Sequence, residues 1–144
     1  MLTLDSSVVI PALDSSHEAH EEALAFLQQA GEVRLIAHVA LETYHVLTRV
    51  RPYRRLPPHV VARAIRDTFG DPWLAVAPED CWTVIDRAPK SGIVGGAIFD
   101  ALIATAAQRA GLQLVSRDRK AAATYSVVGV DCRLLSTDPD SRDS

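Results

Sequence analysis

A single carboxylate stands in an otherwise apolar stretch of this sequence, residues 98–107 (IFDALIATAA), where Asp100 is the only ionisable residue. As a helix, this stretch would be hydrophobic on nearly every side, which is typical of a buried helix. Burying an ionised carboxylate is costly unless a positive charge lies beside it. Arg109 lies too far along the helix to supply that charge. Asp100 therefore either uses the helix dipole after Gly95 and Gly96, or is compensated by another part of the fold or by a metal ion.

Three further carboxylates stand where a protein of this pattern would bind a ligand. Asp5 ends the first predicted strand, Glu42 lies early in the helix after the second, and Asp118 follows the fourth. In open parallel sheets, ligands bind beyond the carboxyl ends of the strands. Any one of these acids could be a helix cap, but their occurrence as a set favours a shared site over caps alone.

Converging carboxylates predict a metal site, because four close negative charges cannot all stay ionised unaided. Mg²⁺ and Mn²⁺ prefer oxygen ligands and carry the missing positive charge. A cation held in this way typically serves phosphodiester hydrolysis, in which it activates water and stabilises charge at phosphorus.

The pattern of strands and helices predicts how these acids are positioned. Apolar runs predict strands at residues 2–4, 33–36, 73–77, 112–115 and 127–135. Between them we expect helices at 8–13, 17–30, 37–49, 59–69, 79–88, 98–107 and 119–124, with a loop over 89–96. Strands that alternate with helices are typical of a three-layer α/β/α fold with a central, mainly parallel sheet. Residues 1–135 would form one domain, and 136–144 (STDPDSRDS) a disordered tail.

Composition is compatible with a cytoplasmic protein that binds nucleic acid. No apolar run is long enough to span a bilayer, and the N-terminus has no signal-peptide pattern. Cys81 and Cys132 are isolated, as expected in a reducing cytosol. The net charge of −3 argues against a nucleic-acid partner, but without the four proposed ligands it becomes −3 + 4 = +1. The remaining surface is thus not dominated by acids.

The ordered set of acids resembles that of the PIN-domain nucleases: Asp5 in LDSS, Glu42 in ALETYHVL, Asp100 in FDALIATAA and Asp118 in SRDRK. The short chain and its DALIA segment are most similar to VapC-type toxins of prokaryotic toxin–antitoxin pairs, over residues 2–135. The resemblance implies a Mg²⁺- or Mn²⁺-dependent endoribonuclease. These acids would be its catalytic residues, and Asp5, Asp100 and Asp118 would bind the metal.

The resemblance also assigns neighbouring residues and partners. Ser116 takes a small hydroxyl position that is often Thr in the family, and Ser7 would support the metal site in a similar way. Ala121 is a departure, because an aromatic residue often stands there. Expected partners are an RNA substrate, a cognate antitoxin that covers the acidic pocket, and a second copy bound through residues 46–69. Hydrolysis by water would leave 5′-phosphate and 3′-hydroxyl ends.

Basic side chains near the last acid are candidates for binding RNA phosphates, namely Arg117, Arg119 and Lys120. A second basic segment, residues 49–55 with Tyr53 inside it, could follow an RNA backbone or form a solvated loop.

Several alternatives accompany this interpretation. His38 and His45 flank Glu42 and either contact the site or have structural roles. His17 and His20 have the wrong spacing for the zinc motif HExxH. The rival function is a non-catalytic PIN-like module that binds proteins and whose carboxylates are structural.

Overall fold

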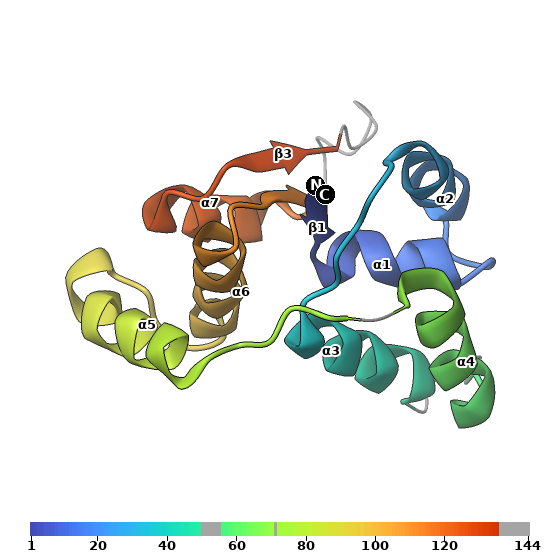
Figure 1. Ribbon diagram of the computed structural model, residues 1–144, viewed down its shortest axis with the longest axis horizontal. Helices are drawn as coiled ribbons and strands as arrows, with labels where there is room; N and C mark the ends of the chain where they lie inside the picture. The colour runs from blue at the N-terminus through green and yellow to red at the C-terminus, as the bar shows by residue number, and fades with distance from the viewer. Residues whose placement is uncertain (50–55, 71, 136–144) are drawn as a thin grey trace.

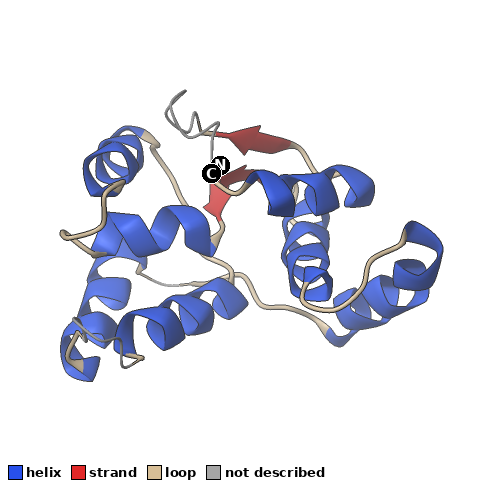
Figure 2. Ribbon diagram, turned by 180° about the vertical axis from the view of Figure 1, so that it is seen from behind, coloured by secondary structure: helices blue, strands red, loops and turns tan. Residues whose placement is uncertain are grey.

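Three short parallel strands form the centre of the computed structural model, which describes residues 1–49, 56–70 and 72–135. They are β1 (Leu2–Leu4), β2 (Gln113–Ser116) and β3 (Cys132–Leu134), in the order β1-β2-β3. Leu4 pairs with Val115, which in turn pairs with Arg133. Figure 2 shows how small this sheet is beside the helices. Parallel pairing brings the carboxyl ends of β1 and β2 to the same edge, where Asp5 and Asp118 follow.

Helices form the two outer layers (Figure 1). On one side lie α1 (Ser6–Leu13), α2 (His20–Gln29), α3 (Ala37–Thr48) and α4 (Pro58–Phe69). On the other lie α5 (Pro78–Ser91), α6 (Ala97–Arg109) and α7 (Arg119–Val128). The prediction of a three-layer α/β/α fold with a parallel sheet is confirmed. No helix within the described ranges has the length and apolar content that crossing a bilayer requires.

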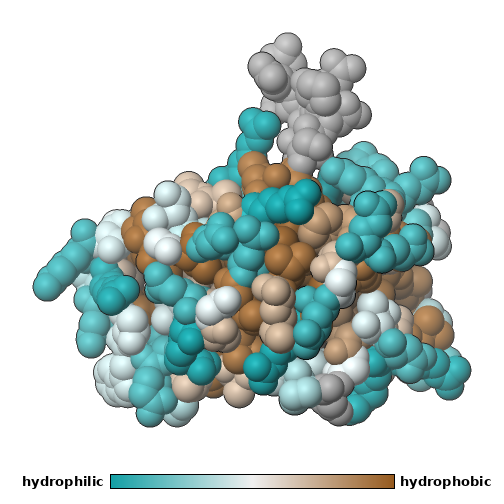
Figure 3. Space-filling model, turned by 45° about the horizontal axis from the view of Figure 1, so that its top comes forward, coloured by the Kyte–Doolittle hydropathy of each residue, from teal (hydrophilic) through white to brown (hydrophobic). Residues whose placement is uncertain are grey.

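The core lies where the two helical layers meet the sheet. Leu4, Leu114 and Val115 of the strands are fully buried, as are Val8 of α1 and Ala104 of α6. Burying a large aliphatic side chain contributes about 1.5–3 kcal/mol, so this contact is the main source of stability. Outside the core, Figure 3 shows hydrophilic side chains spread among hydrophobic ones over the face that it presents.

Two of the predicted strands are reduced to single bridges. The segment 33–36 pairs with β1 only through the bridge between Val33 and Leu2. The segment 73–77 pairs with the segment 33–36 only through the bridge between Leu74 and Ile36. Hydrogen bonds flank both bridges, for example from the Arg34 amide to the Leu2 carbonyl at 2.9 Å. Because α3 begins at Ala37, directly after Ile36, there is no room for a longer ladder.

The predicted strand over 127–135 is wrong at its start, because α7 continues through Val128. The β-branched pair Val127 and Val128 favours a strand, but Tyr125 in the same segment is buried in the core and keeps it helical. Gly129 ends the helix with a φ of 88°, a left-handed conformation that glycine adopts without strain. The strand then begins only at Cys132.

Two other boundaries also differ from the prediction. The second helix begins at His20 rather than at residue 17, after a turn in which the His17 ring accepts a hydrogen bond from the Ala19 amide. The predicted loop over 89–96 starts late, because α5 passes through Pro89 and ends at Ser91. Pro89 lacks an amide hydrogen and is exposed, so water can satisfy the carbonyl that it leaves free. The predicted tail, 136–144, lies outside the described residues.

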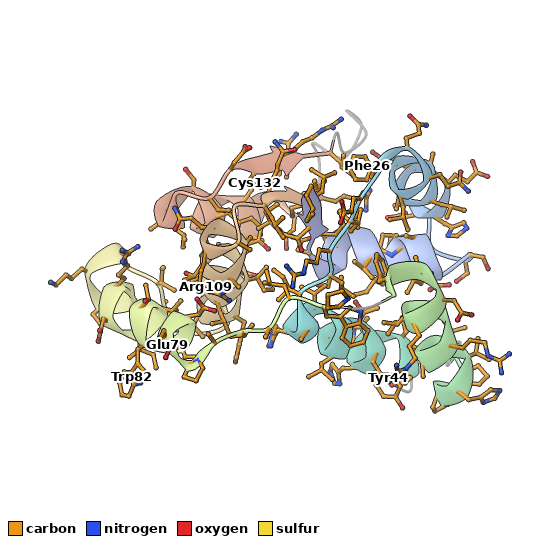
Figure 4. All side chains as sticks on the ribbon, in the orientation of Figure 1. Phe26, Tyr44, Glu79, Trp82, Arg109 and Cys132 are labelled. Carbon is orange, nitrogen blue, oxygen red and sulfur yellow. The ribbon has the colours of Figure 1, made fainter. Side chains whose placement is uncertain are left out.

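An ion pair fixes α5 to α6 and so helps to position Asp100. Arg109 donates from Nε to Asp80 Oδ1 at 2.8 Å and from Nη2 to Asp80 Oδ2 at 3.0 Å. It also donates to the Ala75 carbonyl at 2.9 Å. Burial alone would raise the pKa of Asp80, but Arg109 and the Ala77 amide together hold it below its usual value. Figure 4 shows Arg109 on α6 directed toward the start of α5, where Glu79 lies.

Candidate active site

Asp5 is the most enclosed of the predicted acids, with only 3% of its surface exposed at the end of β1. Its Oδ1 accepts hydrogen bonds from the Ser7 hydroxyl and from the Ser7 amide, the latter at 3.1 Å. Its Oδ2 accepts one from the Tyr125 hydroxyl at 2.9 Å. These donors hold the carboxylate in one orientation and replace part of its lost hydration.

The two serines singled out by sequence join the turn after β1 to the turn after β2. Ser7 Oγ accepts a hydrogen bond from the Arg117 amide at 2.8 Å, and Ser116 Oγ accepts one from the Asp118 amide at 3.0 Å. The two hydroxyl oxygens are 3.3 Å apart. The serines therefore set the relative position of Asp5 and Asp118, which belong to segments more than a hundred residues apart in sequence.

Asp118 is a helix cap as well as a member of the acidic group. Its Oδ1 accepts from the amides of Lys120 at 2.8 Å and Ala121 at 3.2 Å, at the start of α7. No hydrogen bond to Oδ2 is found within the described residues, and the residue is exposed. Capping and ligand binding are thus compatible, because they would use different oxygens.

The negative charges of the other three acids act on the Asp100 carboxyl group. Burial, together with the negative charges of Asp118, Asp5 and Glu42, raises the pKa of Asp100 to about 6. Lys120 opposes this rise. The compensating charge anticipated from sequence therefore comes in part from Lys120 on α7. All four predicted acids act on one region, although they come from four separate segments.

The environment of Asp5 also disfavours a negative charge. Burial raises the pKa of Asp5, although the hydroxyls of Ser116, Ser7 and Tyr125 oppose the rise. Burial likewise raises the pKa of Tyr125, with added effects from the charges of Asp5 and Asp100. The Tyr125 hydroxyl therefore stays protonated and serves as a donor to Asp5.

The acids converge without forming a compact metal shell. In residues 1–49, 56–70 and 72–135, no three His, Cys, Asp or Glu side chains are grouped closely enough to hold a metal ion as they are placed. The charges of these acids act on one another, yet their oxygens are spread over a wider region than a coordination sphere.

The predicted phosphate-binding residues differ in what they contact. Lys120 is exposed and acts on Asp100. Arg117 pairs with Glu22 of α2 at 3.3 Å, and its Nε is buried without a hydrogen-bond partner. Arg119 is exposed. The basic segment 49–55 lies outside the described residues except for Arg49, which is exposed.

The histidines that the sequence analysis considered lie in different surroundings. His20 makes a 2.8 Å hydrogen bond from Nδ1 to the Pro11 carbonyl, so both members of the dismissed zinc pattern hold local backbone structure. His38, on α3, stacks on Phe99 of α6, with ring centroids 5.6 Å apart and an interplanar angle of 10°. His45 is exposed near the end of α3.

Tyr125 is the site residue that sequence reasoning missed. The predicted helix over 119–124 stops one residue before it, so the hydroxyl was never placed near the acids. A signal was available, because Tyr125 lies one turn after Ala121 on the same helical face. Both residues are buried.

A groove lies along α1, beside the two serine-linked turns. It has a volume of about 470 Å³ and begins at Ser7 and Arg117. Its apolar lining includes Ile10, Pro11, Val46, Leu47 and Leu56, and its polar lining includes Asp14, Ser16 and His17. The groove thus offers a partly apolar surface that reaches Ser7, which hydrogen-bonds to Asp5, while none of the four acids is among its described lining residues.

We expect Asp118→Asn to lower the pKa of Asp100 from about 6 toward its ordinary value of 3.8. The substitution removes the neighbouring charge that has the largest effect on this pKa. Asparagine also caps helices, so α7 should be retained. Carbon NMR of the Asp100 carboxyl against pH, in EDTA, measures the change. Asp67→Asn on the exposed face of α4 is the control. An unchanged Asp100 pKa would show that the two acids do not interact.

The same variant should alter how stability depends on pH. Between pH 3.8 and about 6 the folded protein retains the Asp100 proton that the unfolded chain releases. The contribution of Asp100 to the free energy of unfolding therefore falls as pH rises through this interval. This fall should be smaller in Asp118→Asn, as measured by urea unfolding.

Tyr125→Phe should destabilise the protein by about 2 kcal/mol at neutral pH, because it leaves a buried, charged Asp5 oxygen without its donor. The loss should shrink as pH falls and Asp5 becomes protonated. Urea unfolding at several pH values tests this, with Tyr44→Phe on α3 as the control for a half-exposed phenol. A loss that does not vary with pH would mean that Tyr125 contributes packing alone.

The chain is similar to known proteins over most of its length. A family model described as PIN domain matches residues 2–126. Ribonuclease VapC40 of Mycobacterium tuberculosis is 36% identical over 135 residues, which cover 94% of this chain and 99% of that protein.

Solved structures share the fold at much lower identity. VapC20 of Mycobacterium tuberculosis, described as a toxin that cleaves the sarcin–ricin loop, has a TM-score of 0.68 and 16% identity, covering 92% of this chain and 99% of its own. VapBC2 of Rickettsia felis, bound to a DNA fragment from its promoter, has a TM-score of 0.67 and 12% identity, covering 94% and 98%. The family model spans most of the chain, and more than a third of the residues match VapC40 along nearly all of it. This chain belongs to the PIN-domain family.

Proposed function

We propose that this protein is a divalent-metal-dependent endoribonuclease and the toxin of a toxin–antitoxin pair. The observation that carries the proposal is the placement of acids from separate segments at one edge of the sheet, where Ser7 and Ser116 hold the turns of Asp5 and Asp118 together. Burial and the charges of Asp118, Asp5 and Glu42 raise the pKa of Asp100, in agreement with this placement. The name of VapC40, a ribonuclease that this chain matches over nearly its whole length, supports the same reaction.

The chemistry of the donor set fits a hard cation such as Mg²⁺ or Mn²⁺. The converging ligands are all carboxylate oxygens, which these ions prefer over nitrogen or sulfur. The acids repel one another in the absence of a cation, and Lys120 is the positive charge that offsets them at Asp100. Asp5, Asp100 and Asp118 would hold the ion, which would require their carboxylates to lie closer together than they are placed in the structure. When bound, it would supply Lewis-acid stabilisation of phosphate charge and an activated water.

The chain's own residues would orient the reactants. Ser7 and Tyr125 fix both oxygens of Asp5, so its direction is set before any ligand arrives. Glu42 is half-buried beside this group and is available to orient a water molecule or accept its proton. Lys120 would attract a phosphate toward the acids.

Water rather than the RNA 2′-hydroxyl is the proposed nucleophile. The alternative route uses side chains such as a pair of histidines for acid and base catalysis and leaves a cyclic phosphate. Here His17 and His20 hold backbone groups, and His38 is stacked on Phe99. We therefore propose products with 5′-phosphate and 3′-hydroxyl ends.

An antitoxin would occupy the groove along α1. Its apolar lining would bury side chains of a partner peptide, and its end at Ser7 and Arg117 would bring that peptide to Asp5. We place this complex in the cytoplasm. The description of VapC20 as a toxin supports the existence of such a partner.

A homodimer is also proposed, formed with the described parts of the segment 46–69, residues 46–49 and 56–69, and the neighbouring surface of α3. Val60 on α4 is 46% exposed, and Leu41 on α3 is 69% exposed, which leaves large apolar side chains in water. Tyr44 on α3 is also 39% exposed, and Figure 4 shows it at the lower edge of the molecule beneath α3 and α4.

Metal binding should be visible as stabilisation. We expect Mn²⁺ at about ten times its Kd to raise the Tm of the unaltered protein by about 4 °C, through linkage of binding to folding. Asp5→Asn and Asp100→Asn should show a much smaller shift, measured by scanning calorimetry. Asp67→Asn on α4 should respond like the unaltered protein. Equal shifts in all four proteins would place the ion elsewhere.

RNA cleavage separates the enzyme from the rival, non-catalytic binding module. Asp100→Asn should reduce cleavage of RNA at least ~10³-fold while circular dichroism shows a retained fold. EDTA should stop the reaction, and a single 2′-deoxy sugar at the scissile position should not. Growth inhibition by Asp100→Asn equal to that of the unaltered protein would favour the binding module. Products with 2′,3′-cyclic phosphate ends would refute water as the nucleophile.

A further inference from the structure

Two aromatic rings join the helices that carry two of the four acids. His38 of α3 and Phe99 of α6 are stacked nearly parallel, at an angle of 10° and a centroid distance of 5.6 Å. Phe99 remains 55% exposed despite this contact, and His38 is half-buried. The rest of the Phe99 ring faces solvent, and apolar surface in water has a free-energy cost. A ligand that covered this surface would remove that cost.

The position of the pair relates it to the acidic site rather than to the core. Phe99 directly precedes Asp100 in the first turn of α6, and His38 lies one helical turn before Glu42 on α3. Residues one turn apart on a helix share a face, so His38 and Glu42 are presented on the same side of α3. The charge of Glu42 acts on Asp100, which indicates that these faces of the two helices approach each other at the acids as well as at the rings.

Nucleic-acid chemistry matches this arrangement. A single-stranded nucleotide presents a charged phosphate and a flat, largely apolar base, so its binding site needs an electrostatic feature and a ring surface side by side. Lys120 supplies the first, and His38 with Phe99 supplies the second. Stacking on aromatic side chains is tolerant of base identity, because every base has a flat π surface.

We propose that His38 and Phe99 form a stacking platform for an unpaired RNA base next to the scissile phosphate, with Phe99 contacting the base and His38 holding the ring in position. This inference rests on the proposed ribonuclease function and adds the substrate feature that the site recognises. The platform favours single-stranded RNA, because a base inside a duplex is not free to stack on a protein side chain.

The experiment begins with a pool of random single-stranded RNA. The sequence that the unaltered protein cleaves fastest in Mn²⁺ is then synthesised as a defined oligonucleotide. Phe99→Ala should raise KM for this RNA about tenfold, in line with the loss of one stacked base. Phe99→Tyr should restore most of the affinity, whereas Phe99→Leu, which keeps apolar volume but no ring, should not. Val127→Ala on α7 removes an equally exposed apolar side chain, at 56%, and should have no effect.

A direct readout of stacking uses 2-aminopurine, a fluorescent base that is quenched when it stacks. It is placed in turn on each side of the cleavage site, in RNA bound to an Asp5→Asn protein to prevent cleavage. Quenching at one position, lost in Asp5→Asn/Phe99→Ala and retained in Asp5→Asn/Phe99→Tyr, is the expected result. His38→Ala should weaken the quenching less than the loss of the Phe99 ring does.

Several outcomes would overturn the platform. If Phe99→Ala cleaves the defined RNA with an unchanged KM and retains quenching, the ring does not contact the base while the ribonuclease function stands. If Phe99→Ala changes the molecular mass in light scattering from dimer to monomer and Phe99→Leu preserves both dimer and KM, the ring covers a second copy instead. If the unaltered protein neither binds nor cleaves any RNA in the pool, the proposed function fails together with the platform.

Discussion

The burial of the Asp5 carboxylate is the constraint on which the rest of the site depends. It lies at the end of the central strand β1, where only 3% of its surface is exposed. Its lost hydration is replaced by Ser7 from α1 and Tyr125 from α7, two helices on opposite sides of the sheet. Because a buried carboxylate without donors would be strongly unfavourable, these hydrogen bonds tie both helical layers to the same strand end.

Fixing Asp5 in this way concentrates negative charge. The neighbouring turn is held through Ser7 and Ser116, so Asp118 cannot move far from Asp5. Burial and the charges of these acids together raise the pKa of Asp100. The pairing of Arg109 with Asp80 keeps α6, which carries Asp100, in place. Holding like charges together lowers the stability of the folded protein. Proteins commonly accept such a loss at sites where a bound ligand offsets the charge.

The placement of positive charge is as selective as that of negative charge. Lys120 acts on the acidic group, whereas Arg117 turns its side chain to Glu22 and gives only its amide to the site. A chain with a net charge of −3 can therefore still offer a phosphate a local cation beside a potential metal site. The aromatic contact between His38 and Phe99 adds a surface of different chemistry beside the same acids.

Local sequence patterns determined the identity of the acids and the order of most elements. Period and capping patterns placed the helices that carry Glu42 and Asp100, because an amphipathic or wholly apolar helix is set by nearby residues. Asp5 and the two serines were identifiable because they follow short apolar strands. The family resemblance rests on this local information and extends over almost the whole chain.

Only the tertiary structure decided how far each segment continues and what surrounds each acid. The valines at 127 and 128 favour a strand by local preference, but the burial of Tyr125 extends α7 and brings its hydroxyl to Asp5. The segments 33–36 and 73–77 have strand-like composition, yet the start of α3 limits them to single bridges. The pairings of Asp5 with Tyr125, of Asp80 with Arg109 and of His38 with Phe99 join residues distant in sequence. Such contacts arise from packing between layers, which no local pattern of residues specifies.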